Sequence, residues 1–207
     1  ALNFITSILI ARYLGPEDFG RFSFLIVSFS ALGGFTNFNS REAFFTFLSE
    51  KVRTKRFIIF FWVWILFQYI LLLIIVSIFS SNEISLKIWN EKDKLIIFLA
   101  LTGCFLEHSV WSVALNMAEA QRNTIIVQRI NLFIGVMHLF SILMLFYYGI
   151  LIIKYIFLII IIEYSVASII AFKLYVPLDV GNHKLSRRQS LDRFGKMFWS
   201  FCKPFIL

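Results

Sequence analysis

The segment Phe57–Phe79 contains no charged residue, and it constrains what this chain can fold into more than any other feature. As an α-helix it would be about 34 Å long, enough to cross the hydrocarbon core of a bilayer, which is about 30 Å thick. A single segment in lipid can satisfy all its backbone hydrogen bonds internally only as a helix. We therefore expect a membrane-spanning helix here.

The composition of the whole chain agrees with this expectation. Hydrophobic residues make up 59% of the 207 residues and charged residues only 15%, whereas soluble domains contain about 45–50% apolar and about 25% charged residues. Hydropathy predicts an all-α integral membrane protein with six spans and the start of a seventh. The expected spans are 1–14, 21–38, 57–79, 95–118, 127–147 and 155–175, with a further one beginning near 198.

The expected spans imply a simple domain organisation. Residues 1–175 form one transmembrane bundle, 176–197 a cytoplasmic linker, and 198–207 the beginning of a second bundle. The first apolar stretch, Ala1–Leu14, would be only about 21 Å long as a helix, and the last stretch stops shortly after it begins. From this we expect the chain to be a fragment cut at both ends.

The distribution of basic residues predicts the orientation. Of the 20 lysines and arginines, 14 lie in the loops that follow the second, fourth and sixth spans. By the positive-inside rule these loops and the N-terminus face the cytoplasm. The net charge of +8 follows this loop alternation, so it does not indicate nucleic-acid binding. The segment Arg41–Arg56, apolar at 44, 45, 47, 48 and 52, suits either an interfacial amphipathic helix or an extension of a neighbouring helix.

Acidic residues within the spans are the first candidates for function. Glu163 lies near the middle of the sixth span, where an acid costs about 2.5–3.5 kcal/mol on insertion. The twelve Leu, Ile, Phe and Val residues of that span contribute about 4–7 kcal/mol in the opposite direction. The helix should therefore insert with Glu163 facing the bundle interior or a wet cavity, next to a partner.

The fourth span carries Glu107 and His108 side by side. At about 100° per residue, a polar stripe forms on one side of this helix, and Glu107 points away from it. The stripe consists of Thr102, Ser109 and Asn116, with His108, Ser112 and Glu119 adjoining. It suits either helix–helix packing or the wall of a water-filled transport path. Glu107, His108 and Glu163 are accordingly our hypothetical residues for ion coupling.

No motif for catalysis or for holding a cofactor or a metal is apparent. The sequence lacks a phosphate-binding GxxxxGK[ST] loop, GxSxG, HExxH and CxxC. Its two cysteines and three histidines are scattered, and we expect them to be ordinary packed or exposed residues. We therefore expect a protein that is not an enzyme and needs no cofactor.

The adjacent Gly33 and Gly34 permit bending or close approach, which in a transporter suggests a hinge.

Residues 10–24, IARYLGPEDFGRFSF, carry a resemblance. Gly15 and Pro16 stop a helix, Glu17 and Asp18 face water, and Gly20 frees the chain to re-enter the membrane. The segment resembles the first helix–turn–helix of Wzx-type polysaccharide flippases, which belong to the superfamily of the multidrug and toxic-compound extrusion (MATE) carriers. The loop segments 39–42 and 120–122 are also similar to that family.

The resemblance implies a fold, a substrate and a location. Such carriers consist of two bundles, of which this chain would be the first, and they move undecaprenyl-pyrophosphate-linked oligosaccharides for O-antigen or capsule synthesis. The location would be the bacterial cytoplasmic membrane. The partners would be membrane lipids, a polysaccharide polymerase and a chain-length regulator. Arginine suits pyrophosphate, so Arg12, Arg41 and Arg122 are the candidates for binding it.

Two other functions stay open at this point. A membrane-bound polysaccharide polymerase, which is an enzyme, also has many aromatic-rich helices, but it usually carries a long extracytoplasmic loop. The longest outward loop expected here, 80–94, is short. A drug or ion antiporter of the same superfamily would equally suit polar residues in the second, fourth and sixth spans.

Overall fold

A computed structural model describes residues 2–49, 55–80 and 82–175, together with the isolated positions 192, 195, 196 and 199. Every regular element in this part is helical, which confirms the all-α class. The predicted linker 176–197 and the segment 198–207 lie outside the described residues apart from those four positions. The helices are α1 Leu2–Asn37, α2 Ser40–Ser49, α3 Lys55–Phe79, α4 Asn82–Trp89, α5 Lys94–Phe105, η1 Leu106–Trp111, α6 Ser112–Ala120, α7 Thr124–Tyr147 and α8 Ile153–Tyr175.

Five helices of the described chain are long and apolar enough to cross a membrane. They are α1, α3 from Phe57 onward, the continuous stretch Lys94–Ala120, α7 and α8. The protein is therefore a multi-pass membrane protein. The sequence predicted six spans because it separated 1–14 from 21–38, whereas the structure places both segments in α1.

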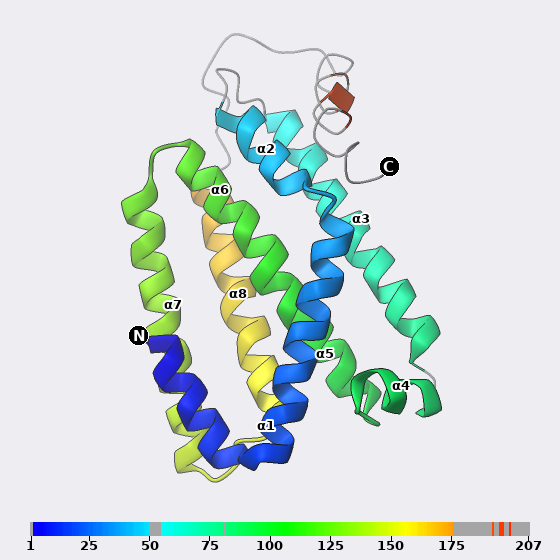
Figure 1. Cartoon of the computed structure of the whole chain (residues 1–207). Helices are drawn as coiled ribbons and strands as arrows, with labels where there is room; N and C mark the ends of the chain where they lie inside the picture. Colours follow the sequence, from blue (N-terminus) through cyan, green and yellow to red (C-terminus); the bar gives the residue numbers. More distant parts are fainter. Residues whose placement is uncertain are drawn as a thin grey trace.

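A sharp bend divides α1 into two arms, which form a V in Figure 1. Gly15 lies at the bend with φ 76° and ψ 171°, a conformation essentially restricted to glycine. Pro16 follows at the first turn of the second arm, where the missing N–H costs no helical hydrogen bond. Gly20, which was expected to contribute to the turn, lies within the second arm instead, as do Gly33 and Gly34.

Successive connections alternate between two ends of the bundle (Figure 1). The bend of α1, α4 and the α7–α8 turn lie at one end, which we call the α4 end. The α1–α2 turn, α2 and the α6–α7 turn lie at the other, the α2 end. The short helix α4 was expected as a loop; Trp89 anchors it by stacking on Phe29 of α1, with ring centroids 5.8 Å apart.

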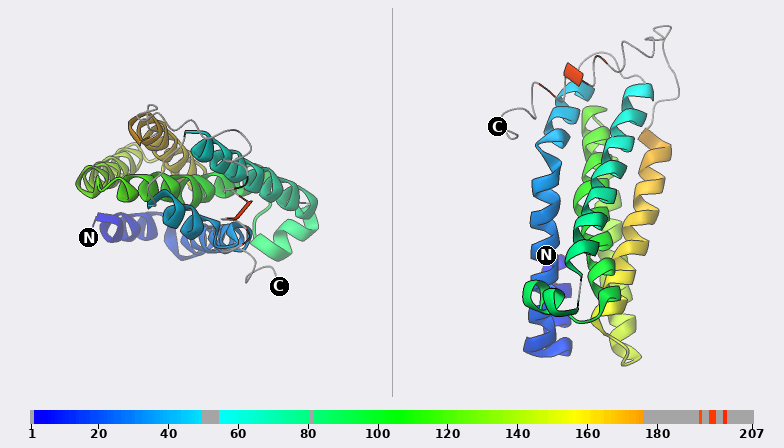
Figure 2. Two further views of the ribbon diagram at one scale, coloured as in Figure 1. Left: turned by 90° about the horizontal axis from the view of Figure 1, so that it is seen from above. Right: turned by 90° about the vertical axis from the view of Figure 1, so that its right-hand side faces the viewer.

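The stretch α5–η1–α6 forms the centre of the bundle. Among the described helices, its neighbours include α1, α3, α7 and α8, and the views in Figure 2 show it between α1 and α8. Of the 18 most apolar consecutive residues in this stretch, 50% are buried, whereas only 11% are buried in the corresponding part of α7. Gly103 permits the close contact with α8, because a Cβ there would already lie 3.4 Å from Ile160 Cγ2. The exposed apolar residues of α7 suit contact with lipid.

Candidate functional site

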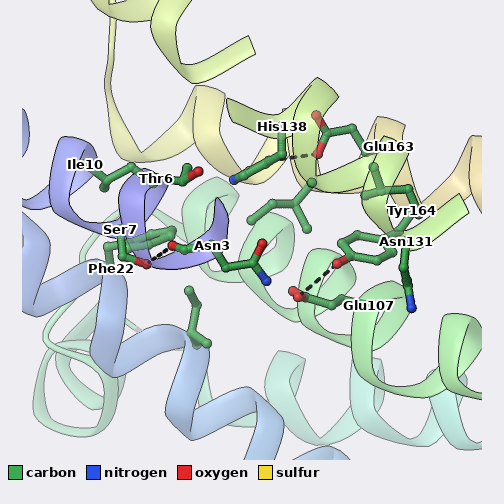
Figure 3. A pocket seen from close by; sticks show the side chains of 14 residues that line it. Asn3, Thr6, Ser7, Ile10, Phe22, Glu107, Asn131, His138, Glu163 and Tyr164 are labelled. Carbon is green, nitrogen blue, oxygen red and sulfur yellow. Dashed lines mark hydrogen bonds and ion pairs between the residues drawn. The ribbon is translucent and has the colours of Figure 1, made fainter. Parts of the chain in front are cut away.

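A cavity of about 510 Å³ lies among α1, η1, α7 and α8 (Figure 3). We call it the polar cavity because eight of its 14 lining residues carry polar side chains. Those residues are Asn3, Thr6, Ser7, Glu107, Asn131, His138, Glu163 and Tyr164. His138 and Glu163 lie near the middle of their helices, so the cavity lies about halfway along α7 and α8.

The first arm of α1 forms one wall of the polar cavity. The bend at Gly15 turns this arm back beside α7 (Figure 1), which brings Asn3, Thr6 and Ser7 to the cavity. The arm rests against Gly135 of α7, where a Cβ would lie only 3.5 Å from Leu2 Cδ1. The spacing of the three polar residues places them on one face of the arm.

A histidine–glutamate pair joins α7 and α8 on another side of the polar cavity. His138 Nδ1 lies 2.8 Å from Glu163 Oε2, and the two side chains are 19% and 11% exposed. The second carboxylate oxygen, Oε1, is buried without a hydrogen-bond partner. The sequence predicted that Glu163 would have a partner but did not identify it. That partner is His138, which we had expected to be an ordinary packed or exposed residue.

A second acidic residue reaches the polar cavity from η1. Tyr164 Oη donates to Glu107 Oε1 over 3.1 Å, and Figure 3 shows both side chains beside the cavity. Because η1 is a π-helical segment, its residues advance by less than 100° each. The regular spacing used for the sequence prediction therefore does not hold here. His108 is exposed and lines a different pocket, so it forms no pair with Glu107.

A second group of polar side chains lies outside the polar cavity, and we call it the α2-end cluster: Asn37, Ser40, Arg41, Trp64, Gln68 and Asn116. Ser40 Oγ donates to Asn37 Oδ1 over 3.0 Å. It accepts hydrogen bonds from Trp64 Nε1 and Gln68 Nε2, over 3.1 and 3.3 Å respectively. These contacts join α1, α2 and α3. The pocket beside Arg41 measures only about 20 Å³.

Arg41 connects this cluster to η1. Its Nη1 donates to the backbone oxygen of His108, which also accepts from Ser112 Oγ over 2.7 Å. Asn116 Nδ2 donates to the backbone oxygen of Arg41 over 3.4 Å. Burial lowers the pKa of the Arg41 guanidinium, and the carboxylate of Glu42 opposes that effect. Of the amphipathic segment predicted at 41–56, the part up to Ser49 belongs to a separate helix, α2, and residues 50–54 lie outside the described residues.

The polar stripe predicted on the fourth span holds helices together. Thr102 Oγ1 lies 2.9 Å from Tyr69 Oη of α3, and Asn116 contacts α2. Ser109 is buried against α1, where its Oγ is 3.9 Å from a Cβ built on Gly33. The packing alternative therefore describes these three residues. Glu107, which lay outside the stripe, is the residue of this helix that reaches the polar cavity.

The three candidate arginines do not form one site. Next to Arg12, the ring of Tyr13 packs 5.4 Å from that of Phe146, near the end of α7. Arg122 precedes the start of the same helix, which is about 36 Å long. Arg12 therefore lies at the α4 end and Arg122 at the α2 end, where Arg41 also lies. Arg12 and Arg122 are exposed, whereas Arg41 is half-buried.

Sequence reasoning missed several residues of the polar cavity, although a signal was present. Asn131 and His138 are seven residues apart, which places them on one face of α7 two turns from each other. Asn3, Thr6 and Ser7 follow the same helical rule. Each was a polar residue within an apolar segment, a position that carries a high cost in lipid.

Comparisons with protein-family models, with curated proteins and with solved structures find no match. In the described part of the chain, no three His, Cys, Asp or Glu side chains are grouped so as to hold a metal ion. Cys104 is a buried free thiol, and Cys202 lies outside the described residues.

Proposed function

We propose that this chain is part of a transporter that flips undecaprenyl-pyrophosphate-linked oligosaccharides across the bacterial cytoplasmic membrane. The polar cavity among membrane-spanning helices is the observation that carries the transport function, and the resemblance of residues 10–24 suggests the substrate. In this proposal the two arms of α1 count as separate spans. Residues 1–175 then form the first, six-span bundle of a two-bundle carrier, with a cytoplasmic N-terminus.

The position and chemistry of the polar cavity support transport. Ionisable residues within membrane spans are costly and mark substrate or ion pathways, and transporters bind their substrates near the middle of the bilayer. Two carboxylates and a histidine meet here on three different helices. The oligosaccharide would cross through this space while the lipid tail stays in the bilayer.

The pyrophosphate needs a separate place. Neither arginine nor lysine occurs among the 14 residues that line the polar cavity, and its two carboxylates repel an anion. We assign capture of the pyrophosphate to Arg41 and Arg122 at the α2 end, which faces the cytoplasm in the proposed orientation. Arg12 at the α4 end would contact it after transfer.

Ion coupling is assigned to Glu163 and Glu107. Both carboxylates line the cavity, and each contacts a titratable side chain, His138 and Tyr164 respectively. His108 was the third coupling candidate, but its exposed side chain does not line this cavity. We therefore transfer its role to His138.

A drug or ion antiporter of the same superfamily is a second candidate. The observation that favours it is the same lining, which has two acidic residues and no basic residue other than His138. A cationic compound would be attracted to such a cavity.

The two candidates differ in what the full protein moves across a membrane. We would reconstitute it in vesicles containing a fluorescent undecaprenyl-pyrophosphate disaccharide and measure protection of the sugar from an impermeant lectin. Flipping above the rate of protein-free vesicles supports the flippase. Its absence, together with proton-driven uptake of ethidium, would establish the antiporter instead.

Variants test the assigned residues in the same vesicles. Glu163→Gln should reduce flipping about tenfold, as expected when an interaction of about 1.4 kcal/mol is lost, and Arg12→Ala and Arg41→Ala should also reduce it. Phe140→Leu, at an exposed position of α7, is the control that should retain the rate. Unchanged flipping in Glu163→Gln would remove the coupling role, and unchanged flipping in both arginine variants would remove the pyrophosphate role.

A further inference from the structure

The hydroxyl groups that α1 brings to the polar cavity already use their hydrogens. Thr6 Oγ1 donates to the backbone oxygen of Leu2 over 3.1 Å. Ser7 Oγ donates to the backbone oxygen of Asn3 over 2.8 Å. Each hydroxyl has one hydrogen and two lone pairs. Toward a ligand, both therefore offer acceptors.

The aromatic donors around the cavity are engaged as well. Tyr164 Oη donates to Glu107 Oε1, and Trp111 Nε1 donates to Asn131 Oδ1 over 2.8 Å. The second carboxylate oxygen of Glu163, Oε1, is buried with no hydrogen-bond partner. Among the described lining side chains, the amides of Asn3 and Asn131 are left as donors.

The histidine presents a further acceptor. A carboxylate can only accept hydrogen bonds, so the contact of 2.8 Å with Glu163 places the hydrogen of a neutral imidazole on Nδ1. Nε2 is then the bare acceptor of the ring. Figure 3 shows this end of the His138 ring directed toward Thr6 and away from Glu163.

We propose that the polar cavity selects its ligand by hydrogen-bond donors, and that His138 Nε2 accepts from a hydroxyl of the transported sugar. Glu163 acts as a positioning residue that keeps the hydrogen on Nδ1. The proposal rests on the proposed function and deepens it by naming the contact that determines specificity. A sugar supplies many hydroxyl donors, whereas a pyrophosphate supplies acceptors, for which the lining offers only the amides of Asn3 and Asn131 beside two carboxylates.

Binding to the full protein in a detergent without sugar groups tests the proposal independently of transport. The probe is a short-chain prenyl-pyrophosphate disaccharide, and its fully O-methylated counterpart lacks the hydroxyl donors. We expect the unmethylated probe to bind at least tenfold more tightly. His138→Phe should abolish most of that difference, as expected for the loss of one buried hydrogen bond, and Phe140→Leu should retain it.

Two substitutions of Glu163 separate positioning from simple packing. The amide oxygen of Glu163→Gln can still accept from Nδ1, so this variant should keep binding close to that of the unaltered protein. Glu163→Leu removes the acceptor and should weaken binding about tenfold. The side-chain ¹⁵N resonances of His138 should report a shift in tautomer in Glu163→Leu and little change in Glu163→Gln.

Several results would overturn the inference. Equal binding of the two disaccharide probes would show that hydroxyl donors are not selected, and tighter binding of tetraethylammonium than of the disaccharide would identify a cation site. Equal binding by Glu163→Leu and Glu163→Gln would exclude the positioning role. Hydroxyl-dependent binding without flipping would support the inference while contradicting the proposed flippase, so the two failures are distinguishable.

Discussion

The polar cavity and the α2-end cluster place similar side chains in very different surroundings. Ser40 Oγ is hydrogen-bonded to three side chains of the protein, and the adjoining pocket, beside which Arg41 Nε is buried without a partner, measures only about 20 Å³. Around His138 and Glu163, about 510 Å³ is open, and a carboxylate oxygen is buried without a partner. Internally satisfied polar groups hold helices together in a membrane. Unsatisfied groups beside an open space are more informative about a ligand.

The two regions also receive their charged side chains in different ways. Arg41 reaches in from α2, near the bundle end, and donates to a backbone oxygen of η1. Glu107 leaves the same segment η1 toward the polar cavity. The π-helical segment thus connects the two regions, and π-helical turns are frequent at functional sites.

The largest effect should come from Ser40→Ala, which tests the structural side of the comparison. The substitution removes the Ser40 hydroxyl, which donates to Asn37 and accepts hydrogen bonds from Trp64 and Gln68. We expect a loss of about 3 kcal/mol in the free energy of unfolding, measured by denaturant titration in mixed micelles, and unchanged affinity for the disaccharide. Ser49→Ala on the exposed part of α2 is the control. Equal stability of the two variants would contradict the assigned role of the cluster.

Gly15→Ala should have the next largest effect, because both regions depend on the bend of α1. An alanine at φ 76° and ψ 171° costs about 2 kcal/mol, although its Cβ would meet nothing within 4 Å. The first arm should then move away from the polar cavity, and the loss of its polar side chains there should weaken disaccharide binding. Gly20→Ala, within the helix and equally uncrowded, should keep both stability and binding. The same denaturant titration and binding measurement compare the two variants.

Tyr164→Phe should have the smallest effect. It removes the hydrogen bond to Glu107, worth about 1 kcal/mol of stability, and returns one acceptor to the polar cavity. Disaccharide affinity should be retained or increased. Tyr155→Phe, at an exposed position of α8, is the matched control. A strong loss of affinity in Tyr164→Phe would indicate that the phenol donates to the ligand, contrary to the acceptor-rich description of the cavity.

The helices of this protein could be predicted closely from the sequence, but the site could be predicted only in part. Helix bounds follow from long apolar runs such as Phe57–Phe79, because the lipid imposes the same requirement on every span. The bend at Gly15–Pro16 follows from local backbone sterics. Glu163 could be identified as buried because its cost in lipid depends only on its depth.

Other features depended on neighbours distant in the chain. The partnership of Glu163 with His138 joins residues on two helices, and neither helix alone determines which faces meet. The π-helical segment η1 was not predicted either, because a periodic pattern assumes a regular helix.

By itself, the sequence determined that this chain forms apolar helices and where most of them begin and end. That information is local, because a helix in lipid satisfies its own backbone. The tertiary structure decided which polar residues became structural and which face an open cavity. That outcome depends on how five membrane-spanning helices pack, and a few small residues such as Gly103 and Gly135 set their approach.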